Sequence, residues 1–376
     1  MRIVDASGNE LPVGDIPARS IYVAVKFVDT LGAATGYKTA DGKPRVSCTP
    51  YTYDVAEGNL TGHEVFHRIA YTPTINTTES EVWSKAGKYV FPTAEQAMEV
   101  VSSDNTQDIG TAIFSGTSTG GTTTSLIDTG KDFTAGTAVA VGDCVILDKS
   151  GASPEFGYVT GVATTTLTVA GGFSAGGSGD TRAYTVIDKS AYTGAQAVEF
   201  EYLDSSYVEH TEIVILNGTS AVATVNSDIF RINNMHLIAT GSLNESLGNI
   251  SLRGTGAGAT YAYITATFTQ SRSSIYTVPT GKTLFITLLT FGFGAPNDTK
   301  FQSARLNFRA NFVRHNNFHT GNLFFPFREV QCTNAEVVFP LAVPIVIPAQ
   351  TDLKSSAIAA TGGSGPGTFS MDGWLE

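Results

Sequence analysis

Residues 63–67 read HEVFH, which matches the HExxH pattern of zinc hydrolases. On a helix, His63 and His67 would share one face and could bind a zinc ion, while the intervening glutamate would act as general base. The flanks oppose a helix, because Gly62 precedes the string and Pro73 closely follows it. On a strand, the two histidines would lie about 13 Å apart, which is too far for one metal ion. We keep His63 and His67 as metal candidates only, and we expect no catalytic residues, no metal and no cofactor.

Two further sets of polar residues are compatible with chemistry but fit structural roles. Asp128-Thr129-Gly130 matches the aspartic protease string, and it is also a common turn sequence, which is the interpretation we favour. A glycosidase needs two carboxyl groups roughly 5–10 Å apart. The candidates are four glutamates spaced two or three residues apart in two neighbouring strand patterns, Glu199, Glu201, Glu209 and Glu212. Because these patterns predict a hairpin with one solvated face, we expect all four to face solvent.

The composition indicates a β-protein and argues against a protein that coats nucleic acid. The chain has 376 residues, with 23 basic and 34 acidic side chains, so its net charge is −11. Coating a duplex requires basic side chains that neutralise phosphates. Charged residues make up only 15% of the chain, against roughly 25% in an ordinary soluble domain. Glycine, serine and threonine take their place, which is typical of short strands joined by tight turns.

The sequence lacks the signatures of a disulfide framework, a zinc cage, a secretion signal and a membrane span. Its three cysteines, Cys48, Cys144 and Cys332, are far apart and have no CxxC spacing. Residues 1–20 contain no apolar segment of the kind found in signal peptides. The longest apolar candidate, Phe339–Pro348, is too short for a bilayer and is interrupted by prolines. We expect a protein made in a cytoplasm, with neither a membrane nor a nucleic acid as partner.

Period-two patterns predict an all-β fold of sandwiches or barrels, and the resemblance described below implies a jelly-roll-like β-sandwich for the body. Residues 196–204 alternate apolar and acidic side chains, as a strand with one solvated face does. Residues 113–188 are rich in Gly, Ser and Thr, and the sequence after them reads as a continuation of the sequence before them. This predicts a small β-barrel inserted into a loop of a larger β-domain. The predicted body is a discontinuous sandwich of residues 1–112 and 189–290. A Phe-rich C-terminal β region, 291–376, is either separate from that sandwich or part of it.

Nine phenylalanines crowd residues 291–327, with arginines interleaved among them. One small core can hardly hold all nine, and aromatic residues with arginine are enriched at the cores of interfaces. A monomer that exposed them would carry more contiguous apolar surface than a soluble chain tolerates. We therefore predict a homo-oligomer, with a trimer as the expected closed ring; the alternative is that these rings fill a C-terminal sandwich. The interface candidates are Phe301, Phe308, Phe312, Phe318, Phe324, Phe325 and Phe327.

Several strings resemble proteins of tailed bacteriophages. Residues 130–169 contain GKDF, VGDCVILDKSG, VTGV and TTLTV, an arrangement similar to a small β-domain that recurs in phage structural proteins. The strings EYLDSSYVEHTEIVILNGTSAV, YTVPTGKTLFIT and VIPAQTDLK and the closing DGWLE resemble a family of phage virion-associated proteins. The resemblance covers roughly three quarters of the chain, from about residue 80 onward. It implies a virion component of β-sandwich or jelly-roll type, without catalytic residues.

From this resemblance and the composition we expect a capsid cement or decoration protein, located in the virion. Its partners would be the major capsid protein or other virion proteins, and it would act through interface area and not as an enzyme. Two alternatives stay open. One is a tail, collar or head-fibre component that binds host-surface glycan. The other is a virion-associated metallohydrolase that uses Glu64 between His63 and His67.

Overall fold

The computed structural model describes most of the chain from Gly58 onward, and the elements it places there are all β-strands. The described residues are 55, 57–58, 60–149, 154–170, 172–174, 181–294, 303–311, 324–333, 336–360 and 363–376. The predicted all-β class is therefore confirmed. The chain divides into two units at residue 57, and all strands below belong to the second unit, Gly58–Glu376.

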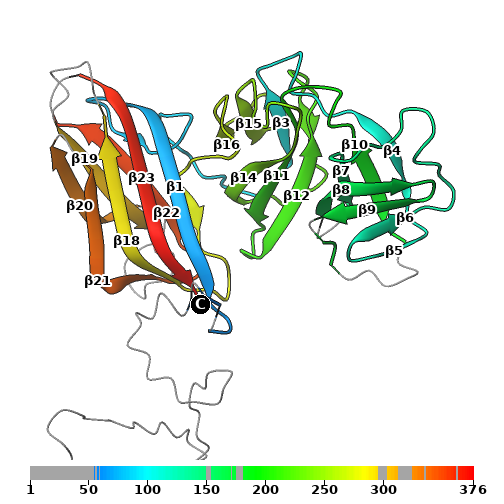
Figure 1. Cartoon of the computed structure of the whole chain (residues 1–376). Helices are drawn as coiled ribbons and strands as arrows, with labels where there is room; N and C mark the ends of the chain where they lie inside the picture. The colour runs from blue at the N-terminus through cyan, green and yellow to red at the C-terminus, as the bar shows by residue number, and fades with distance from the viewer. Residues whose placement is uncertain are drawn as a thin grey trace, which may run out of the picture. The chain divides into compact units, whose positions relative to one another are not determined.

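The first and last strands of this unit form a sandwich that we call the outer sandwich (Figure 1). One sheet has the order β1-β23-β18-β21, with the bounds Glu64–Ile75, Gly365–Leu375, Leu284–Phe293 and Val337–Ile347. The other has the order β17-β22-β19-β20, with the bounds Tyr276–Thr277, Asp352–Ala359, Ser303–Asn311 and Phe325–Thr333. Strand β2, Ser80–Glu81, also pairs with β22. Apolar side chains from both sheets share one core, which includes Phe291, Phe308 and Phe369.

A second sandwich, which we call the middle sandwich, is inserted between β2 and β17. One sheet has the order β12-β11-β14, with the bounds Glu209–Ile215, Ala195–Leu203 and Arg231–Thr240. The other has the order β13-β3-β15-β16, with the bounds Val222–Ala223, Met98–Ser102, Ile250–Gly254 and Thr260–Ile264. Alternation along β11 turns Val198, Phe200 and Tyr202 into the shared core, as the period-two pattern predicts.

A third module, the insert, is formed within residues 112–187. Its sheet has the order β4-β10-β7-β8-β9-β6-β5, and in the described residues these strands pair only with one another. The bounds are Ala112–Thr117, Ala183–Ile187, Cys144–Leu147, Glu155–Ala163, Thr166–Ala170, Ser125–Ile127 and Gly120–Thr122. Only Ser118 and Thr119 separate the edge strands β4 and β5, so the sheet curls round on itself as a small barrel does. Phe133 and Leu167 lie in its core.

The modules are nested, and this changes the predicted boundaries. The body expected from residues 1–112 and 189–290 is two sandwiches, because β1 and β2 pair with C-terminal strands and not with β3. The boundary expected at residues 290 and 291 falls inside β18, whose pairing with β23 continues to Phe293. The Phe-rich region thus shares its sandwich with β1, β2 and the first half of β18. Residues 1–54 of the expected body lie outside the described residues.

Hydrogen bonds hold together the two chain segments that lead into and out of the insert. The backbone N–H of Asp188 donates to the carbonyl of Thr111 at 3.0 Å, so the two ends of the insert are adjacent. Nearby, the fully buried carboxylate of Asp108 accepts four hydrogen bonds. The donors are the backbone N–H groups of Ala195, Leu247 and Gly248 and the hydroxyl of Ser102, at 2.6 to 3.0 Å. This network ties β3, β11 and the 246–248 turn together, so the middle sandwich stays closed where the insert leaves it.

The insert packs against the middle sandwich through a buried apolar cluster. From the insert the cluster takes Cys144, Ile146 and Ile187, and from the middle sandwich Ala197, Ile213, Ile238 and Ala239. The hydroxyl of Tyr158 also donates to the carbonyl of Ile238 at 2.6 Å. The insert therefore folds as its own sheet but covers apolar surface of the module that carries it.

A buried ion pair joins the middle and outer sandwiches. Arg231 on β14 donates from Nε and Nη2 to the two carboxylate oxygens of Asp352 on β22, at 2.8 and 3.0 Å. The two side chains are only 6% and 3% exposed. Arg231 Nη1 donates to the carbonyl of Pro92 at 2.7 Å, and the Thr277 hydroxyl donates to Asp352 at 2.7 Å. Each charge therefore has a bidentate partner and a further hydrogen bond.

Replacing residues 113–188 by a short Gly/Ser linker should leave a folded remainder, because residues 111 and 188 are already adjacent. The deletion uncovers Ile213 and Ile238, so we expect a soluble product only when both are also changed to Thr. Circular dichroism and thermal unfolding of the two deletion variants would measure this. Loss of the β signal in the Ile213→Thr/Ile238→Thr deletion variant would show that the insert is required for folding.

Asp352→Leu should lower the free energy of unfolding by about 3–5 kcal/mol, because it leaves the buried Arg231 guanidinium without its carboxylate. The double variant Arg231→Met/Asp352→Leu should recover most of that loss, since both charges are then absent. Urea unfolding of the two variants beside the unaltered chain measures the difference. Equal midpoints for Asp352→Leu and the unaltered chain would contradict this account.

Candidate functional site

The HEVFH string lies at the start of strand β1 and not on a helix. The imidazole of His67 is hydrogen-bonded to the carboxylate of Asp372, directly opposite on β23. Glu64 accepts two hydrogen bonds from Lys282 Nζ, both at 2.7 Å. His63 precedes the strand, and its Nε2 lies 3.7 Å from a carboxylate oxygen of Glu376. The three side chains that a zinc hydrolase would use together thus have separate partners, as a strand conformation requires.

Of the four candidate glycosidase carboxylates, Glu212 does not face solvent, and this expectation was wrong. Glu212 is 1% exposed, because period two places it on the same face of β12 as the core residue Val214. Its carboxylate accepts hydrogen bonds from the backbone N–H groups of Val225 and Asn226, at 2.6 and 3.2 Å. It therefore fixes the 225–226 turn. Glu209 is exposed and lies 3.5 Å from Lys282 Nζ.

Glu199 and His236 form a half-buried titratable pair on the other face of that sheet. They are register partners on β11 and β14, and Glu199 Oε1 lies 3.7 Å from His236 Nε2. Burial, reinforced by the neighbouring charge of Glu201, raises the pKa of Glu199 to about 7. Burial lowers the pKa of His236, while Glu201 opposes that change. Burial thus favours the neutral form of both groups.

A hollow at the end of β11 includes Glu201, a neighbour of this pair, in its lining. It has a volume of about 350 Å³, and Glu201, Glu209 and His210 are among its lining residues. His210 is 3.2 Å from Asp204 and stacks on the ring of Tyr202. Within the described residues, no group of three or more His, Cys, Asp or Glu side chains is placed to hold a metal ion.

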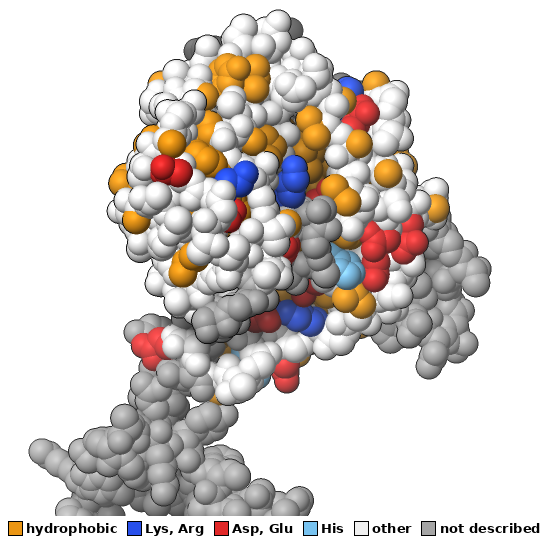
Figure 2. All heavy atoms as spheres, turned by 90° about the vertical axis from the view of Figure 1, so that its right-hand side faces the viewer, with side chains coloured by type: hydrophobic (Ala, Val, Ile, Leu, Met, Phe, Trp, Pro, Cys, Tyr) orange, Lys and Arg blue, Asp and Glu red, His pale blue; other side chains and the backbone are white. Residues whose placement is uncertain are grey.

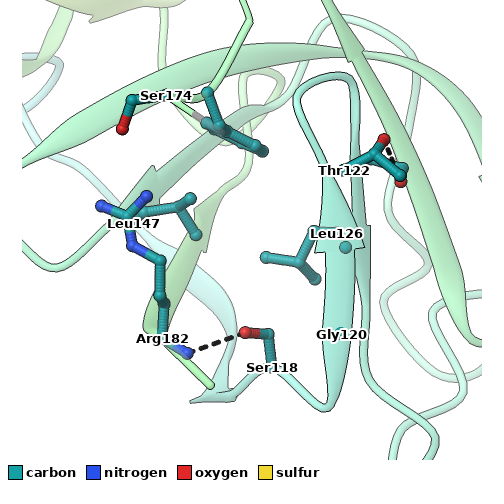
Figure 3. A pocket seen from close by; sticks show the side chains of 10 residues that line it. Ser118, Gly120, Thr122, Leu126, Leu147, Ser174 and Arg182 are labelled. Carbon is teal, nitrogen blue, oxygen red and sulfur yellow. Dashed lines mark hydrogen bonds between the residues drawn. The ribbon is translucent and has the colours of Figure 1, made fainter. Parts of the chain in front are cut away.

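The insert contains a small hollow at one end of its sheet (Figure 3). Its volume of about 20 Å³ has room for about one water molecule and not for a sugar ring. Arg182 lies at this hollow, but its guanidinium is held by Asp148 at 2.5 Å and by Glu155 at 2.7 Å. A ligand anion would have to displace two carboxylates.

Two serines of the form GxSxG line the same hollow, a feature that the sequence analysis missed. They are Ser118 in residues 116–120 and Ser174 in residues 172–176. The Ser118 hydroxyl accepts from the backbone N–H of Arg182 at 2.9 Å, and Ser174 is bonded to Glu155. Neither serine lies on a strand-to-helix turn, which is where a hydrolase holds its nucleophile. The sequence 113–188 also contains no histidine that could act as base. These serines fit a structural role.

Asp128 forms the turn that the sequence predicted. Its Oδ1 accepts from the backbone N–H of Gly130 at 2.9 Å, which closes the turn at the Asp-Thr-Gly string. Its Oδ2 accepts from the hydroxyl of Tyr184 on β10 at 2.7 Å. The side chain is buried within the insert, so the protease-like string is a structural element of this barrel.

The interface candidates among the phenylalanines have different surroundings. Phe301, Phe312 and Phe318 lie outside the described residues. Phe308 is 1% exposed, and its ring packs on Phe327 and Phe369 with centroids 4.4 and 5.7 Å apart. Phe308 is therefore a core residue and not an interface residue, because β19 turns it inward between the two sheets.

The remaining candidates lie at or near the edge of the outer sandwich. Phe324 stacks on Phe91, with centroids 5.4 Å apart, and lies beneath Lys354 Nζ. Phe325 and Phe327 are half-buried on β20, the last strand of its sheet. Phe327 also lines a hollow of about 420 Å³ with Pro326, Arg328, Glu329 and, from β21, Phe339. This hollow therefore has an apolar part, formed by Pro326, Phe327 and Phe339, and a charged part, formed by Arg328 and Glu329.

Comparison of the chain with family models, with curated proteins and with solved structures finds no match. In the part of the chain that the structure describes, no helix has the length and apolar character needed to cross a membrane. The functional argument therefore rests on the residues and their geometry.

Glu199→Gln should stabilise the protein at pH 8 by about 1–2 kcal/mol, allowing for partial solvent screening. The pKa of Glu199 is raised by folding, so the native state disfavours the charged form, and stability falls as the pH rises through about 7. Below pH 4 the carboxyl is protonated in both states, and the gain should vanish. Urea unfolding at both pH values measures it, with the exposed Glu336→Gln as the matched control. Equal gains at both pH values would contradict the burial argument.

Proposed function

We propose that the chain is a structural component of a tailed-phage particle and acts as a capsid cement or decoration protein. One observation carries this proposal: the polar groups that could do chemistry are bound in internal contacts, whereas neutral and apolar surface is exposed. His67, Arg182 and Arg231 each have a carboxylate partner within the chain. Figure 2 shows a face on which neutral polar groups and backbone predominate and charged side chains are scattered. Such a surface suits fixed protein–protein contacts.

A cement protein stabilises a capsid through the area of its interfaces with the shell. An interface of about 1,600 Å² repeated over a shell adds resistance to internal pressure at each contact without any chemical step. The major capsid protein or a neighbouring virion protein is the proposed partner. We further propose that the chain is a homo-oligomer, with a trimer suited to the three-fold positions of a capsid.

The insert favours a second candidate, a tail, collar or head-fibre component. Its strands pair only among themselves in the described residues, so it can be presented as a separate module. Binding of host-surface glycan would then use its loops, since the hollow in Figure 3 is too small for a sugar ring. We do not propose the metallohydrolase, because the strand conformation separates the HEVFH side chains.

Counting copies in the particle tests the proposal. Mass spectrometry and image reconstruction of particles from the genome that encodes this sequence should find on the order of hundreds of copies on the shell. Particles that lack the chain should release their DNA at a lower temperature than complete particles. About twelve copies or fewer would favour the tail or collar role. Absence of the chain from purified particles would overturn a virion role.

A further inference from the structure

Strand β21 is an edge strand of the outer sandwich and has an unusual bulge. It is the last strand in the order β1-β23-β18-β21, so one side of it is unpaired within its sheet. Its register with β18 passes from Ile286 opposite Ile345 to Leu288 opposite Pro340. One residue of β18 is thus matched by four of β21, Leu341–Pro344, which we call the β21 bulge. An excursion of this length must leave the line of the strand.

The β21 bulge and its flanks are apolar and exposed. Residues 337–348 contain no charged side chain. Val343 in the bulge is 78% exposed, and Val338 and Val346 on either side are more than half exposed. Edge strands of soluble proteins usually carry charged residues that oppose association. An uncharged run with exposed valines on such a strand indicates a surface that is covered by another protein.

The prolines limit how that surface can be covered. Pro340 and Pro344 have no backbone N–H and cannot donate to an added strand. The bulge also breaks the straight edge that an added strand would need. A partner must therefore pack side chains against this edge, which excludes an extended peptide that binds by sheet extension.

The same edge also contains a hollow. The hollow of about 420 Å³ lies where β20 and β21 meet, and we call it the edge hollow. Its lining combines apolar Pro326, Phe327 and Phe339 with the exposed charges of Arg328 and Glu329. An apolar protrusion and a mixed hollow, with three apolar residues and one charge of each sign, thus occur on one edge. Because the hollow carries both an arginine and a glutamate, this edge is complementary in charge to a second copy of itself.

We propose that the β21 bulge of one chain packs into the edge hollow of a second copy. This inference rests on the homo-oligomer of the proposed function and names the surface through which it forms. Arg328 of one copy then lies near Glu329 of the next, and Val343 is buried at the centre of the contact. A head-to-tail contact of this kind, repeated around an axis, closes a ring in which each copy uses both its bulge and its hollow.

Val343→Asp tests the contact with little risk to folding, because the side chain is exposed in the single chain. Light scattering of the full chain at about 20 μM should give the mass of several chains, and Val343→Asp should give that of one chain, with a dissociation constant raised at least tenfold. The matched control is Val141→Asp, a 70% exposed valine on the insert, which should leave the mass unchanged. Mixed Val343→Cys and Pro326→Cys chains should form a cross-linked dimer under mild oxidation.

The outcomes separate this inference from the proposals on which it rests. If Val343→Asp stays multimeric and the mixed cysteine variants do not cross-link, the edge is not the contact, and the homo-oligomer stands. If the unaltered chain has the mass of one chain, both the contact and the homo-oligomer are overturned. The copy number in the particle is measured independently, so a role in the virion can survive either result.

Discussion

The arrangement depends on a charge that is buried where two modules meet. Arg231 and Asp352 are 121 residues apart in the sequence, yet they share two hydrogen bonds inside the protein. Desolvating both ions is costly, and their attraction offsets that cost only in close bidentate geometry with further partners. Any slip of β14 relative to β22 would leave two unpaired buried charges. The pair therefore contributes more to specifying one docking of the middle and outer sandwiches than to raw stability.

Nested insertion requires that each module bring its own chain ends together. The outer sandwich is interrupted between Glu81 and Tyr276, and the middle sandwich is interrupted in turn by the insert. Loop-closure entropy grows slowly with length, so a folded insertion with adjacent ends costs its host little. The bond between Asp188 and Thr111 and the network around Asp108 provide that closure. The apolar cluster between the insert and the middle sandwich has a second consequence. Without the insert, the apolar side chains of the middle sandwich in this cluster would be exposed to solvent.

Patterns within short stretches of sequence predicted single strands and the position of the insert. Alternation along residues 196–204 gave strand β11 with the correct inward face, and the change in composition located an insert whose strands span residues 112–187. Glu212 was misplaced because a buried carboxylate bound to backbone N–H groups looks, in sequence, like a solvated one. The division into two sandwiches depends on β1 pairing with β23, about 300 residues away, and no local pattern encodes such a pairing. Phe308 was assigned to an interface because the number of rings, and not their alternation, was used.

The two edges of one sheet are protected in different ways, and the contrast bears on function. Strand β1, at one edge, exposes Glu64, whose charge opposes pairing with another sheet, beside the exposed apolar Val65 and Ile69. Strand β21, at the opposite edge, has no charge, and its backbone is guarded by Pro340, Pro344 and the β21 bulge. Both edges expose apolar side chains, but only on β21 is the run free of charged residues. In the homo-oligomer that we propose, the uncharged β21 edge packs against a second copy, and the charge of Glu64 keeps the β1 edge from pairing with another sheet.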